Sequence, residues 1–156
     1  MNELTISRAI HILSIVIWIG GVSFVTAIIL PAIKSQFGFA QQESIFQLVE
    51  NRFAKLAKWM VIIAGASGFY MVYLLDAWDR FMGVQFFWMH AMVLIWGIFM
   101  LALFVIEPIL AKNHVKHSQD PKQTLKLTLR LHIVLLTLSL LTVFVAVLGA
   151  HGAFYQ

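Results

Sequence analysis

The stretch "IHILSIVIWIGGVSFVTAIILPAI", residues 10–33, is an apolar run in which the only ionisable side chain belongs to His11. A helix needs about 20 such residues to cross the hydrocarbon core of a bilayer. Backbone amides that face lipid must be paired within their own segment, so the run is expected to be a helix. It is too long for the core of a cleavable signal peptide and lacks a clear small-residue cleavage site. We therefore expect a retained transmembrane span.

The rest of the chain has the same apolar character. Of its 156 residues, 61% are hydrophobic and 12% are charged, and the mean hydropathy is +0.88, whereas soluble domains are about a quarter charged. Four runs are long enough to span, at about 5–33, 54–76, 82–111 and 126–151. With no long soluble segment and no clear repeat, the sequence predicts a single domain, 1–156, of the all-α class: an integral membrane four-helix bundle.

The basic residues predict the orientation of this bundle. Nine of the eleven Lys and Arg lie around the two connections that follow spans one and three, and only Arg8 and Arg80 lie at the other side. The positive-inside rule then places both termini outside, with up-down-up-down topology, in the inner (cytoplasmic) membrane of a bacterium. The high isoelectric point reflects this topology, so no nucleic-acid partner is expected. Aromatic residues are expected to form a belt at the outer boundary: Tyr70, Tyr73, Trp78, Phe86, Phe87, Trp88 and Tyr155.

Three features belong to the inner half of the predicted bundle. The segment "QQESIFQLVENRFAKL", 41–56, has apolar residues at helical spacing and is expected to run along the inner surface into span two. Glu107 is the only acid inside a span, which suggests either an ion pair with Lys112 or Arg130 or a proton path toward a quinone. The motif "HVKH", 114–117, is interpreted as a surface histidine pair.

The histidines are the main candidates for chemistry. His11, His90 and His151 lie near the outer ends of three different spans, and His132 lies near the inner end of span four. A lone intramembrane histidine is usually satisfied by a hydrogen bond, but several at one depth favour a ligand set. Neutral imidazole binds iron, copper and zinc well, and bundle interiors often hold such sites.

The favoured cofactor is haem b, with His11 and His90 as axial metal ligands. Helical spacing puts His11, Ser14, Trp18 and Gly21 on one stripe, which is expected to face the interior. The flat macrocycle is expected beside Trp18, Gly21 and Gly97, and His132 and His151 are further cofactor-binding candidates.

In span three, the residues that share a face with His90 are Leu94, Gly97 and Leu101, and in span four those with His132 are Ser139, Ala146 and Ala150. The motif "AGASG", 64–68, suggests either close helix packing or room for a cofactor.

Copper is the alternative cofactor. Soft thioethers together with imidazole suit Cu(I), and four methionines lie in the outer half: Met71, Met82, Met89 and Met92. Methionine is also common as filling in membrane cores. The absence of cysteine excludes thiolate metal sites, iron–sulfur clusters, disulfides and covalently attached haem.

Two motifs carry a resemblance to a known family. "AIHILSIVIWIGG" resembles the first helix of the bacterial membrane-bound, haem-containing protoporphyrinogen oxidases (the HemJ type), and "FWMHAMV" resembles their Trp-Leu-His-Ala-Lys-Leu segment. The first motif is also similar to that of the copper-resistance protein D family. By position, the resemblance covers His11, Trp18 and Gly21, then Trp88, His90 and Ala91, and it implies haem b with His11 as an axial ligand. The lysine of the second motif is Met92 here, so the resemblance does not carry over porphyrinogen oxidation.

These observations lead to one expected function and two alternatives. We expect a membrane haem b protein with an electron-transfer or oxidoreductase role, passing electrons between a quinol and a partner, and leave open whether it is an enzyme of the protoporphyrinogen oxidase-like type. Copper binding or uptake, and an accessory role in a respiratory complex, are the alternatives. The expected partners are the lipid bilayer, a quinone or quinol, and either a second copy of the chain or a respiratory complex.

Overall fold

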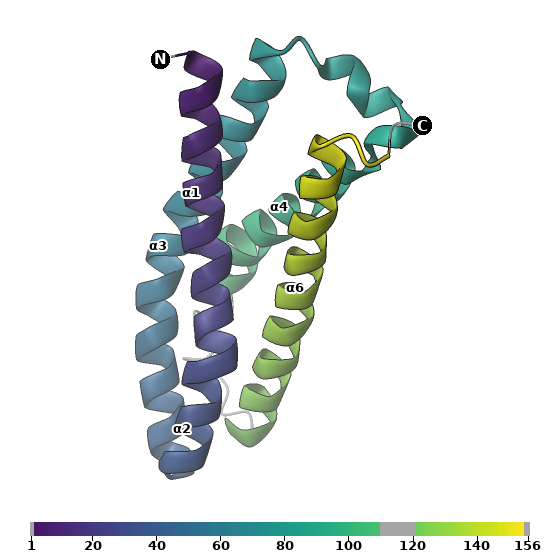
Figure 1. The fold of residues 1–156 in the computed structure, drawn as a ribbon. Helices are drawn as coiled ribbons and strands as arrows, with labels where there is room; N and C mark the ends of the chain where they lie inside the picture. Colours follow the sequence, from purple (N-terminus) through teal and green to yellow (C-terminus); the bar gives the residue numbers. More distant parts are fainter. Residues whose placement is uncertain (1, 110–120, 155–156) are drawn as a thin grey trace.

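The computed structural model describes residues 2–109 and 121–154, without the side chains of residues 39, 40, 43 and 121–128. The described chain is helical, with no strand (Figure 1). In chain order, the elements are α1 (Glu3–Phe24), the π-helical turn η1 (Val25–Ile29), α2 (Leu30–Gln36), α3 (Phe39–Leu74), the 3₁₀ turns η2 (Trp78–Met82) and η3 (Val84–Phe86), α4 (Phe87–Leu101), the π-helical turn η4 (Ala102–Ile106) and α6 (Pro121–Ala150). The all-α class is confirmed. The predicted pair His114 and His117, and Tyr155 of the belt, lie outside the described residues.

Four helical segments are long and apolar enough to cross a membrane. They cover Glu3–Gln36, Ser44–Leu74, Val84–Ile109 and Leu129–Ala150. These segments confirm the four predicted spans, although the second begins ten residues earlier than expected, at 44 instead of 54. The chain is therefore consistent with a multi-pass membrane protein.

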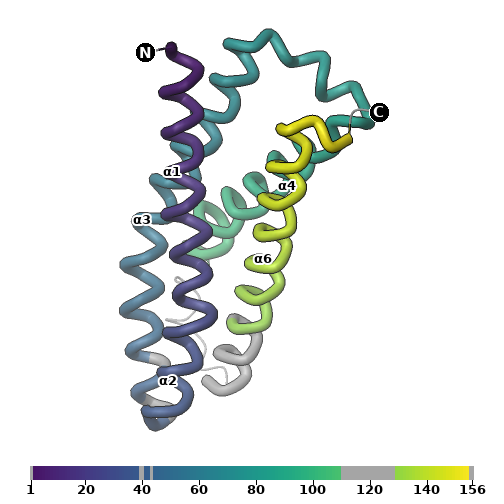
Figure 2. Tube along the Cα trace, viewed as in Figure 1, coloured from purple at the N-terminus to yellow at the C-terminus, as the bar shows by residue number. Residues whose placement is uncertain are grey.

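The helices pack as two arms. α1 and α3 lie side by side along their length, and α4 crosses behind α6 to form the second arm (Figures 1 and 2). α1 begins and α6 ends at the same end of the molecule, which is uppermost in the figures and is called the upper end here. The turns η2 and η3 join the two arms at this end.

The segment 41–56 is not a separate surface helix. It forms the first part of one continuous helix, α3, as expected of a segment that runs into span two. Phe46 is 6% exposed and packs with Val25, Leu30 and Ile33 of the first span. Ile45, Val49 and Phe53 of the segment pack against the same cluster, whereas Leu48 and Leu56 are exposed. Gln42 braces the connection by donating to the Phe37 carbonyl at 2.6 Å.

Two prolines explain the two π-helical turns. η1 ends two residues before Pro31, and η4 ends two residues before Pro108. Proline lacks the N–H that an α-helix would use and its ring pushes against the preceding turn, so the chain widens there instead of breaking.

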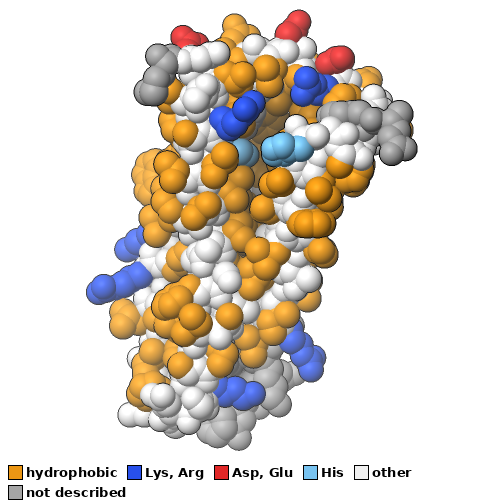
Figure 3. Space-filling model, in the orientation of Figure 1, with side chains coloured by type: hydrophobic (Ala, Val, Ile, Leu, Met, Phe, Trp, Pro, Cys, Tyr) orange, Lys and Arg blue, Asp and Glu red, His pale blue; other side chains and the backbone are white. Residues whose placement is uncertain are grey.

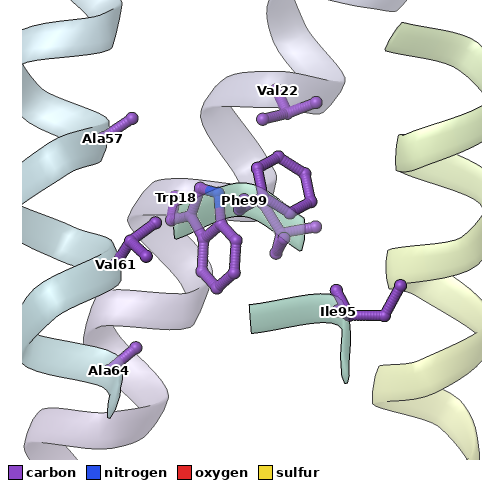
Figure 4. Packing of buried hydrophobic residues seen from close by; sticks show 8 residues of the cluster. Trp18, Val22, Ala57, Val61, Ala64, Ile95 and Phe99 are labelled. Carbon is purple, nitrogen blue, oxygen red and sulfur yellow. The ribbon is translucent and has the colours of Figure 1, made fainter. Parts of the chain in front are cut away.

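The core joins the two arms at mid-height (Figure 4). Trp18 of α1 meets Phe99 of α4 edge-on, with ring centroids 4.7 Å apart. On α3, Ala57, Val61 and Ala64 present small side chains to this pair. The contact between Trp18 and Phe99 fixes the position of α4 along the axis of α1. It therefore also sets the height of His90 relative to His11.

Candidate histidine site at the upper end

His11 is held by α3. Its Nδ1 lies 2.8 Å from the carbonyl oxygen of Ala64 and 3.3 Å from Oγ of Ser67. A carbonyl oxygen only accepts hydrogen bonds, so Nδ1 carries the proton and Nε2 keeps its lone pair. A Cβ placed on Gly68 would lie 3.1 Å from Cε1 of the ring, so the glycine is what lets the ring approach α3. The motif "AGASG" thus seats His11.

His90 turns toward the connection between the arms. Its Nε2 lies 2.9 Å from the carbonyl oxygen of Phe81, and the two rings meet edge-on with centroids 5.6 Å apart. The face of α4 that carries His90 is exposed, since Leu94 and Leu101 are 65% and 59% exposed. The buried face of α4 consists of Trp88, Met89, Ile95 and Phe99.

His151 lies directly after the last residue of α6. Its Nδ1 is 2.8 Å from the carbonyl oxygen of Val147, one turn back, so this histidine also keeps the proton on Nδ1. Its Nε2 makes no hydrogen bond with another described residue. The ring is exposed at the upper end.

Packing contacts place these three histidines at related levels. Trp18 meets Phe99, and the indole ring of Trp88 lies against Gly149, where no Cβ would fit. Counting along the helices from these contacts, His90 and His151 lie within about two helical turns of the level of His11. Figure 3 shows histidine side chains beside a hollow between the arms at the upper end, below basic side chains.

His132 is not part of this group. It precedes His151 by 19 residues on α6, a rise of about 28 Å in a regular helix. Its half-buried ring meets Phe46 edge-on, with centroids 6.4 Å apart, near the opposite end of the molecule.

Of the three residues expected to flank the macrocycle, two are covered by other side chains. Trp18 is 4% exposed and covered by Phe99, and the notch at Gly21 is occupied by the ring of Phe53. Only Gly97 faces open space. A flat cofactor therefore has no room beside Trp18 and Gly21, which corrects the expectation for these two residues.

The side chains of the upper end include donors that a haem can use. Two imidazoles, His11 and His151, each have Nδ1 fixed on a backbone carbonyl and Nε2 available. The indole N–H of Trp88, at the same end, is buried without a hydrogen-bond partner among the described residues. No three His, Asp or Glu side chains of the described part of the chain gather closely enough to hold a metal ion.

The methionines and Glu107 have different surroundings from those expected. Met89 is buried at 6% exposure, whereas Met82 is 90% exposed. Glu107 pairs with Lys58 of α3, with Nζ and Oε2 2.5 Å apart, and not with Arg130, whereas the other predicted partner, Lys112, lies outside the described residues. The carboxylate of Glu107 is thus engaged in a contact between α3 and the end of η4.

Comparisons with family models, with curated proteins and with solved structures find no match to this chain. The functional argument therefore rests on residues and geometry. The contacts that sequence reasoning missed are the Ala64 carbonyl and Gly68 around His11, and the small-residue motif 64–68 was the available signal for both.

Proposed function

We propose that the chain is a membrane haem b protein that transfers electrons, in which His11 and His151 would hold the haem iron. The observation that carries the proposal is the hydrogen bond from Nδ1 of His11 to the Ala64 carbonyl. Ligating histidines typically donate their second ring N–H to a carbonyl or carboxylate, which fixes the tautomer and aims the other nitrogen at the metal. His11 has this arrangement inside an apolar span, where an idle imidazole nitrogen is costly.

The second ligand is assigned to His151 in place of His90, which the sequence had suggested. His90 has the same kind of contact with the ring nitrogens exchanged, since its Nε2 donates to the Phe81 carbonyl and leaves Nδ1 available, but its ring packs edge-on against Phe81 in the connection between the arms. His151 keeps Nε2 available, and α6 packs against α1 as well as against α4. Ligation by His151 would therefore leave the loop contacts of His90 intact.

The upper end also carries charges that complement a haem. Haem b has two carboxylates, and Arg8 and Arg80 are the basic side chains of this end. Neither arginine forms an ion pair with another described residue, although Arg80 lies 5.5 Å from the ring of Phe86. Arginine binds carboxylates through paired N–H donors, so these two residues are suited to hold the propionates.

When bound, the haem iron supplies a one-electron redox couple, and ligation by two histidines favours electron transfer over binding of oxygen. The chain supplies the two imidazoles, fixes the tautomer of each, and keeps the core below the site dry by packing Trp18 against Phe99. Quinol is the proposed donor.

The proposed location is the inner membrane of a bacterium, with the upper end and both termini outside. The support is the charge distribution, since Arg8 and Arg80 are the only basic residues of the upper end. The resemblance of the first helix to HemJ-type proteins agrees with haem b and with His11 as a ligand.

The test is the haem content of purified protein, measured by the pyridine haemochromogen spectrum. Wild type is expected to hold haem b, His11→Ala and His151→Ala to lose most of it, and His90→Ala and His132→Ala to keep it. A wild-type protein that binds no haem b overturns the proposal. Loss in His90→Ala with retention in His151→Ala would overturn the choice of the second ligand.

A further inference from the structure

A groove lies on the outside of the contact between α1 and α3 at the upper end, and the proposed haem site does not use it. Its volume is about 360 Å³. The lining residues are Glu3, Ile6, Ser7 and Ile10 of α1 and Ala66, Ser67 and Tyr70 of α3. The small side chains of Ala66 and Ser67, within the motif 64–68, leave this space open.

Polar groups lie at both ends of the groove. At the mouth, the hydroxyl of Tyr70 donates to Oε2 of Glu3 at 3.1 Å. At the floor, the hydroxyl of Ser7 donates to the carbonyl oxygen of Ser67 at 3.1 Å, and both serines are buried. Between them the walls are apolar, formed by Ile6, Ile10 and Ala66. The groove therefore offers a carboxylate and a phenol beside a flat apolar slot.

The floor of the groove reaches His11. Oγ of Ser67 lies 3.3 Å from Nδ1 of His11, and the same hydroxyl donates to the Ile63 carbonyl at 2.6 Å. One residue thus lines the groove on one side and contacts the proposed axial ligand on the other. A molecule in the groove would lie one side chain away from His11.

We propose that this groove binds the dihydroxybenzene head of a membrane quinol. Such a head is a flat apolar ring with hydroxyl groups at opposite ends, which matches apolar walls between polar ends. Glu3 is the hydrogen-bond acceptor for one hydroxyl, and Tyr70 is its neighbour at the mouth. The groove is open at its side and formed by two spans, so the isoprenoid tail would remain in the lipid. The identity of the donor rests on the proposed function, whereas binding in the groove is measured separately.

The experiment uses the full chain, as purified with its haem, in phosphatidylcholine vesicles. A photoreactive azido-benzoquinone with a decyl tail is reduced, bound and illuminated, and the labelled tryptic peptides are identified by mass spectrometry. Cleavage after Arg8, Lys58 and Arg80 separates residues 1–8 and 59–80, which carry six of the seven lining residues. The label is expected on these two peptides and is expected to fall when unlabelled decylbenzoquinol is added.

Matched variants sharpen the result. Ala66→Leu fills the groove and is expected to reduce labelling about tenfold, while Ala9→Leu, at an exposed position of α1 outside the groove, leaves it unchanged. Glu3→Gln and Tyr70→Phe are expected to weaken competition by decylbenzoquinol severalfold, with Tyr73→Phe as the control. Haem content measured on the same samples reports folding.

Labelling spread over other peptides, or equal labelling of Ala66→Leu and Ala9→Leu, overturns the groove as a quinol site even if the protein holds haem. Specific labelling of a protein without haem b would overturn the proposed function and keep the groove.

Discussion

At the scale of single residues, the imidazole of His11 makes a hydrogen bond through one nitrogen and leaves the other nitrogen available for a ligand. An unpaired polar group in an apolar region costs about 1–3 kcal/mol. The Ala64 carbonyl meets this need at Nδ1 and leaves Nε2 without a described partner. A purely structural histidine in the same run gains most from using both ring nitrogens. The contact with Ala64 suits either role, and the proposed function makes use of the available Nε2.

The ion pair between Lys58 and Glu107 is the other residue-scale feature. The two side chains are 30% and 31% exposed, and Nζ of Lys58 also lies 5.9 Å from the ring of Phe104. Within a transmembrane segment, a charge that loses its partner is destabilising even when its side chain reaches the surface of the protein.

We expect Glu107→Gln and Lys58→Met each to lower the free energy of unfolding by about 1–2 kcal/mol, because each leaves one charge without its partner. The double variant should lose less than the sum of the two, by about 0.5 kcal/mol or more. The measurement is unfolding in mixed detergent micelles, with haem content as a check of the native state. Strictly additive losses would show that the contact does not couple α3 to the end of η4.

Sequence pattern singled out Glu107 but not its partner, for a physical reason. As the only acid inside a span it was conspicuous, and the bases considered for it, Lys112 and Arg130, both follow it along the chain. Lys58 was assigned to the flank of span two. The continuous helix α3 starts at Phe39, so Lys58 lies well inside it and meets the chain just after η4.

At the scale of elements, glycines set the spacing between helices. The indole of Trp96 on α4 lies against Gly65 of α3, where a Cβ would come 2.5 Å from Nε1, and that N–H donates to the Val61 carbonyl at 2.9 Å. Gly20 of α1 is different, since a Cβ there would meet nothing within 4 Å. The two glycines form a natural test and control.

Gly65→Leu is expected to lower the free energy of unfolding by about 1–3 kcal/mol, because the rigid indole has to move away from α3 and give up its hydrogen bond. Gly20→Leu should keep or slightly raise stability, because leucine favours the helix over glycine. Thermal unfolding in detergent compares the two. Similar stability of both variants would contradict the packing of Trp96 on Gly65.

Hydropathy predicted the four helices, but it did not predict for every helix which face is buried. In α4 almost every residue is apolar, so the sequence contains no polar stripe to mark the lipid side. Lipid is as apolar as the core, so burial in a membrane leaves little periodic signal in such a helix. The face of His90 therefore looked equivalent to the buried one, whereas the structure buries Trp88, Met89, Ile95 and Phe99. In α1, Ser14 and Trp18 did mark the buried side.

At the scale of the whole molecule, the two ends differ in charge. The upper end carries Arg8 and Arg80 together with the acids Glu3, Asp76 and Asp79, and Figure 3 shows both signs there. Lys34, Arg52, Lys55 and Arg130 lie toward the other end, near the junctions of α2, α3 and α6. Since basic residues are retained on the cytoplasmic side, the upper end should face outward. The haem hollow and the quinol groove would then both open near the outer surface.

The absence of cysteine makes this orientation directly testable. Gln85, in η3, and Ser35, near the end of α2, are both exposed and lie at opposite ends of the molecule. In intact bacterial cells, Gln85→Cys is expected to react with a membrane-impermeant maleimide, and Ser35→Cys to react only after the membrane is permeabilised. The reverse pattern would place both proposed sites on the cytoplasmic side, and would show that the basic residues beside α2 and α3 do not set the topology.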